Sequence, residues 1–276
     1  MQTDPALVND GPKGAVIEIE AKLGQLVNRA TGERLRLPVR TETIFDHTDP
    51  GWQVQFKSSM TDVQHRHLNT FLNRVLHESQ RGPNAEHEAP ARMPLTYVHT
   101  RERDSFYDLP ADMHHILPPS IRQTRNPRHG VRVRVTTDSV GQVIRKIIKT
   151  RIADMNVYSP LTMFDWRVSV NMEMPFAGDH EKLNPVAEGS RTKDRVSYRQ
   201  TIYQVDLTQV TGVSSSFLGK STKKEHELEV EVDGAEIRKQ GLMAKDKKPN
   251  SYEDLVKGFI DNVRVLIRAV PPGPQG

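Results

Sequence analysis

Alternating apolar and polar residues dominate this chain and predict a protein built mainly from β-strands. Residues 15–24, AVIEIEAKLG, set the pattern. Successive side chains point to opposite sides of a strand. Ile17, Ile19, Ala21 and Leu23 therefore share one side, and the other side carries Glu18, Glu20 and Lys22. Such a charged side faces either bulk water or an enclosed polar interior.

The same period of two recurs over residues 96–207 and again in residues 224–233, whereas two segments switch to helical spacing. The first predicted helix covers residues 61–79, with an apolar stripe along one face and Thr61 or Asp62 as its N-cap. The second covers residues 251–270 and begins with the capping-box pattern SYED. Residues 81–94 contain three prolines and one glycine, which predict a surface loop. We expect an N-terminal arm over 1–14, a single domain over 15–270 and a tail over 271–276.

The amino-acid composition excludes several kinds of functional site. None of the 276 residues is cysteine, which excludes disulfides, thiolate zinc sites and cysteine nucleophiles and fits a reducing compartment. No apolar run approaches the roughly 20 residues of a membrane helix, so no membrane partner is expected. The net charge of +4 points only weakly to an anionic partner.

The charged sides of the strands are segregated by sign. HELEVEVD aligns Glu227, Glu229 and Glu231, whereas SRTKDRVSY aligns Arg191, Lys193 and Arg195. For one strand, a side exposed to water is the simpler explanation. Its recurrence in at least five strands, with like charges side by side, favours an enclosed interior, because like charges repel on an open face.

Together the acidic and basic sides predict a site for a metal and a polyphosphate. A divalent cation would relieve the repulsion between the carboxylates, and Mg²⁺ and Mn²⁺ prefer oxygen ligands. Arginine and lysine suit phosphate oxygens. A closed antiparallel barrel, polar inside and apolar outside, would hold both, with helices 61–79 and 251–270 covering its outer surface.

Motifs along residues 15–268 resemble the triphosphate tunnel metalloenzymes, in particular the fungal RNA 5′-triphosphatases, the β subunits of mRNA-capping enzymes. IEIEAKLG resembles the first glutamate motif of that family and ELEVEVD the last. RTKDRVSY followed by QVDLTQV, and IIKTRIADMNVYSP followed by DWRVSVNMEMP, resemble the strands between them. The resemblance implies an eight-stranded tunnel, mainly antiparallel β with packed outer helices.

The resemblance also implies roles for individual residues. The metal ligands are Glu18, Glu20 and Glu231, with Glu227 and Glu229 supporting them. The phosphate-binding residues are Arg134, Lys149, Arg191, Lys193 and Arg195, although Arg132 shares the side of Arg134. Glu173 matches the carboxylate that orients the attacking water, and Asp206 and Thr208 match a supporting strand. Where family members often carry a basic residue, this chain has Gln204.

The function implied is metal-dependent removal of the γ-phosphate from the 5′-triphosphate end of nascent RNA, the first step of capping. A homodimer, an RNA guanylyltransferase partner and a nuclear location follow from the resemblance alone. Two alternatives stay open: a tunnel enzyme acting on inorganic polyphosphate, thiamine triphosphate or free nucleotides, and a non-catalytic RNA-binding β domain. The second predicts stacking aromatics beside the basic residues, and aromatics are sparse on the charged sides of the strands.

Overall fold

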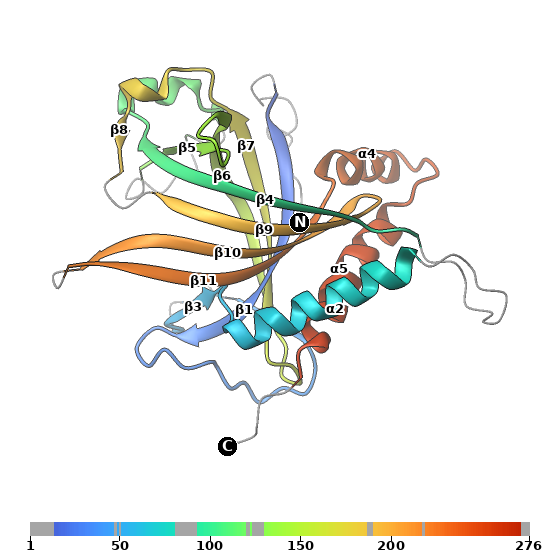
Figure 1. Ribbon diagram of the computed structural model, residues 1–276. Coiled ribbons are helices and arrows are strands. Elements are labelled where there is room, and N and C mark those ends of the chain that lie inside the picture. Colours follow the sequence, from blue (N-terminus) through green and yellow to red (C-terminus); the bar gives the residue numbers. More distant parts are fainter. Residues whose placement is uncertain are drawn as a thin grey trace.

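Antiparallel strands close on themselves to form a barrel (Figure 1). The computed structural model describes residues 14–46, 49, 51–80, 93–119, 122, 130–186, 190–216 and 219–271. Within these residues the barrel has eight strands, which in ring order are β1 (Val16–Asn28), β7 (Asp165–Pro175), β6 (Val143–Tyr158), β5 (Arg132–Thr137), β4 (Thr96–Asp108), β9 (Arg191–Gln200), β10 (Tyr203–Ser216) and β11 (Gly219–Val232). Pairing of β11 with β1 closes the ring. This confirms the predicted fold class.

Smaller elements extend the barrel. Three short strands pair with it: β2 (Thr43–Phe45) with β6, β3 (Val54–Lys57) with β1, and β8 (Asn184–Pro185) with β4. The helices are α2 (Asp62–Gln80), α4 (Gly234–Lys245) and α5 (Tyr252–Ala269), with short 3-10 turns at Ala111–Ile116 and His180–Lys182. No helix within the described ranges is long and apolar enough to cross a membrane.

One flank of the outer surface of the barrel is apolar and packs against α2 and α5 (Figure 1). Leu68 and Leu72 of α2 and Phe259 and Val263 of α5 contribute to a cluster with outward-facing residues of the strands, such as Leu228. Burying each of these side chains stabilises the fold by about 1.5–3 kcal/mol. Because the apolar residues of β1, β10 and β11 are used in this cluster, the charged residues that alternate with them point inward.

The two predicted helices are confirmed, with bounds that differ by about one residue. Thr61 caps α2 as expected: its hydroxyl accepts from Gln64 N, and Gln64 Oε1 accepts from Thr61 N. The capping box predicted at Ser251 is wrong, since that side chain makes no cap hydrogen bond and its backbone N–H donates to Gln240 instead. The arm over 1–14, the loop over 81–94 and the tail over 271–276 lie almost entirely outside the described residues.

The sequence pattern did not predict α4, which follows β11 directly and lies against the start of β1. Asp233 caps it by accepting hydrogen bonds from Ala235 N and Glu236 N. Gly234 is its first residue, and a Cβ there would lie 1.9 Å from the carbonyl oxygen of Ile17. Only glycine fits this close approach of two backbones.

Gly234→Ala is therefore expected to destabilise the protein by about 1–3 kcal/mol, because a backbone oxygen cannot move aside cheaply. Thermal unfolding should show a midpoint lower by several degrees. The matched control is Gly212→Ala on β10, where an added Cβ would come no closer than 3.9 Å to another atom. Equal midpoints for the two variants would show that the junction of β11 and α4 tolerates the extra carbon.

Candidate functional site: a charged tunnel

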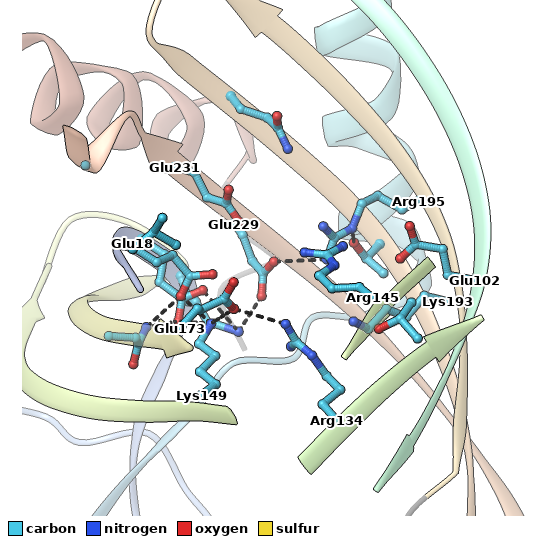
Figure 2. A pocket seen from close by; sticks show the side chains of 18 of the residues that line it. Glu18, Glu102, Arg134, Arg145, Lys149, Glu173, Lys193, Arg195, Glu229 and Glu231 are labelled. Atoms are coloured by element: carbon cyan, nitrogen blue, oxygen red, sulfur yellow. Dashed lines mark hydrogen bonds and ion pairs between the residues drawn. The ribbon is translucent and has the colours of Figure 1, made fainter. Parts of the chain in front are cut away.

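The inward-facing side chains enclose a cavity of about 1390 Å³ that contains charges of both signs. Figure 2 shows glutamates and basic residues from opposite walls pointing toward one another across it. The charged sides predicted from the sequence therefore face an enclosed interior. The alternative, a sheet whose charged side faces bulk water, is excluded for these strands.

The acidic part of the cavity forms where the first and last strands of the barrel pair. The register places Glu20 beside Glu231 and Lys22 beside Glu229. Carboxylate oxygens of Glu18, Glu20 and Glu231 lie within 4.8 Å of one another, and so do those of a second set, Asp206, Glu229 and Glu231. Glu231 belongs to both sets.

Among the described residues, Glu231 is the one carboxylate of these two sets that forms no ion pair. No lysine or arginine in these ranges lies within ion-pair distance of it, and its side chain is partly buried. Burial and the neighbouring carboxylates of Asp206, Glu229 and Glu18 raise the pKa of Glu231 to about 8. Carboxylates crowded in this way, all offering oxygen, make a site where a divalent cation would be strongly stabilised.

Lysines and an amide hold the other carboxylates in place. Lys149 on β6 contacts Glu18 and lies 3.5 Å from Glu20, and Asn171 on β7 donates to both, at 2.8 and 3.1 Å. Lys22 contacts Glu229 and lies 3.8 Å from Glu20. Burial alone would lower the pKa of Lys22, but Glu229 and Glu20 raise it instead, so the lysine stays charged.

The basic wall is organised around one buried aspartate on β4. Asp104 is fully buried, and its carboxylate lies 2.5 Å from Lys193 Nζ and 3.2 Å from Arg191 Nε and accepts from the Thr136 hydroxyl at 2.8 Å. Burial would raise the pKa of Asp104, but Lys193 and Arg191 lower it to about 2. The pKa of Lys193 is lowered to about 8 by burial, against the opposing effect of Asp104 and with help from Arg191 and Arg134.

Arg195 joins the basic wall to the acidic part. Its guanidinium donates to Asp206 at 2.8 Å, to Glu229 at 3.4 Å and to the Thr208 hydroxyl at 3.1 Å. On the opposite wall Glu173 lies 3.0 Å from Arg134 and 3.9 Å from Lys149 (Figure 2). A group bound between these walls would be surrounded by lysine and arginine side chains on several sides. It would have the cluster of carboxylates at one end and the Glu173 carboxylate on the wall opposite Arg195.

Comparison with known proteins identifies the arrangement. The family model described as "mRNA capping enzyme, beta chain" matches residues 8–272. The chain belongs to the mRNA-capping enzyme β-chain family.

Relatives and solved structures agree with this assignment. The β subunit of the mRNA-capping enzyme of Schizosaccharomyces pombe is 34% identical over 91% of this chain and 74% of its own length, and that of Cryptococcus neoformans is 29% identical over 92% and 57%. The solved structure of the S. pombe Pct1 RNA triphosphatase superposes with a TM-score of 0.73 at 33% identity, covering 92% of this chain and 85% of that one. These matches confirm the predicted family, the tunnel fold and the enzyme class, a 5′-triphosphatase.

All the candidate residues of this capping-enzyme β chain come together in or around the tunnel. Those that line it are Glu18, Glu20, Arg132, Arg134, Lys149, Glu173, Arg191, Lys193, Arg195, Thr208, Glu227, Glu229 and Glu231. Asp206 is buried beneath them against Arg195. Their individual roles stay predictions, since the comparisons assign none.

The structure shows which of Arg132 and Arg134 faces the tunnel, and what surrounds Gln204. Arg134 faces the interior with a side chain 14% exposed, whereas Arg132 lies at the rim, 59% exposed and 3.9 Å from Asp108. Gln204, which replaces a basic residue, donates to Asp206 at 2.7 Å and accepts a hydrogen bond from Arg199. Arg199 thus places a cation beside the position where the family pattern has one.

Sequence reasoning assigned no role to three residues of this tunnel. Lys22 continues the side of Glu18 and Glu20 at the same spacing of two, a signal present in the sequence but given no function. Asn171 was seen only as one polar residue of its strand. Asp104 stands in RERDSFYD, where charges fall on both sides of the strand, so no pattern set it apart.

Proposed function

We propose that this chain hydrolyses the bond between the β- and γ-phosphates of 5′-triphosphate RNA, in a reaction that depends on a divalent metal and leaves a 5′-diphosphate end. The observation that carries the proposal is the pairing of β1 with β11, which assembles Glu18, Glu20 and Glu231 opposite a wall of lysine and arginine. A triphosphate with its metal needs this combination of acids and bases.

The donor set fits Mg²⁺ or Mn²⁺. All candidate ligands are carboxylate oxygens, which hard divalent cations prefer, and three protein ligands leave positions for water and phosphate. The partly buried Glu231 carboxylate, which forms no ion pair among the described residues, is the group that a cation would stabilise. When bound, the metal supplies positive charge that neutralises phosphate oxygens as the bond breaks.

The residues of the two walls bind and orient the reacting groups. Arg191, Lys193 and Arg195 receive the phosphate oxygens, and their contacts with Asp104 and Asp206 hold them in place before substrate arrives. Arg134 and Lys149 hold Glu173, which orients the attacking water. Water displaces the diphosphate end in line with the breaking bond, with no covalent intermediate, so positioning and electrostatics supply the catalysis.

The proposal is tested by measuring release of phosphate from RNA labelled at the γ-position, with Mg²⁺, with Mn²⁺ and with a chelator. We expect release only with metal, and RNA left with a diphosphate end. Binding of RNA without turnover in any metal would contradict the proposal and favour the non-catalytic domain. Tripolyphosphate and ATP, assayed in parallel, test whether RNA is the preferred substrate.

Activity is expected to fall at alkaline pH because Lys193 must be charged to bind phosphate. Its pKa of about 8 in the free protein lies below the usual value for lysine, so the charge is present below pH 8 and is lost as the pH rises through it. The profile of kcat/KM against pH should bend downward near pH 8. In Lys193→Arg the guanidinium stays charged, and a bend that persists there would assign the titration to another group.

The proposal extends to partners and location. The S. pombe structure is also solved in complex with the Spt5 CTD, and the names of the relatives describe a subunit of a capping enzyme. We propose that this chain acts beside an RNA guanylyltransferase that uses the diphosphate end, as a homodimer, in the nucleus. Co-purification with that enzyme and the mass in solution test the two assemblies.

A further inference from the structure

One aromatic side chain borders the tunnel amid the charged residues. Phe106 lies on the side of β4 that also carries Val98, Thr100 and Glu102, all of which line the cavity. It is the single aromatic among the described lining residues. The ring is only partly buried and belongs to none of the apolar clusters that stabilise the barrel. Packing of the core therefore does not account for it.

The neighbours of Phe106 are the residues that would bind phosphate. Arg134 is its partner across the β4–β5 pair. The guanidinium carbon of Arg191 lies 5.4 Å from the centre of the ring, within range of a cation–π contact, and Arg191 is itself fixed by Asp104 at 3.2 Å. An aromatic surface is thus held beside the site for the triphosphate.

We infer that Phe106, positioned by Arg191, is the surface on which the first base of the RNA stacks while its triphosphate lies in the tunnel. This inference rests on the proposed function. Stacking is available to every base because each has a π-face, so this contact would accept any first nucleotide. An inorganic triphosphate has no base and gains nothing from the ring. Phe106 would thereby distinguish nucleoside-linked triphosphates from inorganic ones.

The test compares Phe106→Leu, which keeps apolar volume but removes the ring, with the wild type on triphosphate-ended RNA, ATP and tripolyphosphate. We expect the KM for RNA and ATP to rise about 5- to 100-fold. Both kcat and KM for tripolyphosphate should stay unchanged. Phe106→Tyr restores a stacking ring and should return the KM for RNA to near the wild-type value.

Tyr97→Leu is the matched control, because Tyr97 is an exposed aromatic on the outer side of the same strand. It should leave all three substrates unaffected. An equal loss on RNA and tripolyphosphate in Phe106→Leu would assign the ring a structural role and overturn the inference, as would an unchanged KM for RNA. A wild-type protein that cleaves tripolyphosphate but not RNA would instead contradict the proposed function, and the inference with it.

Discussion

Glu20→Ala is expected to lose metal-dependent release of phosphate from triphosphate-ended RNA by at least about 10²–10³-fold while the barrel stays folded. Glu20 is only 2% exposed, and it belongs to the set of carboxylates that converge from β1 and β11. Its removal takes one ligand from the proposed cation site. The positive groups beside it keep other partners, Lys149 on Glu18 and Lys22 on Glu229, so no buried charge is stranded.

Three comparisons make this result specific to the metal site. Glu20→Gln keeps the shape of the side chain and removes its charge, and it should be nearly as defective as Glu20→Ala. Glu33→Ala removes an exposed glutamate that follows β1 and does not line the tunnel, and this variant should be fully active. Thermal unfolding should show that all three variants are folded at the assay temperature. Wild-type activity in folded Glu20→Ala would remove the proposed metal site.

Asp104→Asn is expected to lower activity near pH 7.5 by about 10- to 100-fold, through its effect on Lys193 rather than through contact with substrate. The Asp104 carboxylate stabilises the charged form of Lys193 and so raises its pKa against burial and the nearby arginines. Without that charge the pKa of Lys193 falls below 8. The alkaline bend in kcat/KM should then move to lower pH, and activity should recover as the pH is lowered.

The matched control for this shift is Asp194→Asn. Asp194 also pairs with basic residues, Arg101 at 3.0 Å and His99, but on the outer side of the barrel. Its replacement should leave the pH profile unchanged. If Asp104→Asn loses activity equally at every pH, Asp104 acts by maintaining the structure rather than by tuning the charge of Lys193.

Much of the barrel and its charged interior could be predicted from the spacing of residues within single strands. Glu18 and Glu20 are two apart, as are Glu227, Glu229 and Glu231, so the side they share follows from local geometry. The resemblance to a known family then placed strands from the two ends of the chain in one tunnel. The pairing of Glu20 with Glu231 depends on closure of the ring, which no local pattern contains.

What the sequence did not reveal depends on contacts between strands or on the local backbone. Asp104 on β4 is important because it pairs with Lys193 and Arg191 on the neighbouring strand β9. Phe106, also on β4, is important because it contacts Arg191. The helix α4 was missed because its amphipathic pattern is weak: of its residues only Gly234 and Ile237 are buried. The capping box at Ser251 does not form because the side chain of Gln240 on α4 accepts the hydrogen bond from Ser251 N. In a capping box a residue within the same helix would accept it.

The central claim is that carboxylates from the first and last strands of the barrel hold one divalent cation inside the tunnel. The most direct measurement is the location of Mn²⁺ by anomalous scattering in crystals of this protein. The account predicts one strong peak about 2.1 Å from oxygens of Glu18, Glu20 and Glu231. Manganese bound elsewhere, with no peak among these three residues, would contradict it.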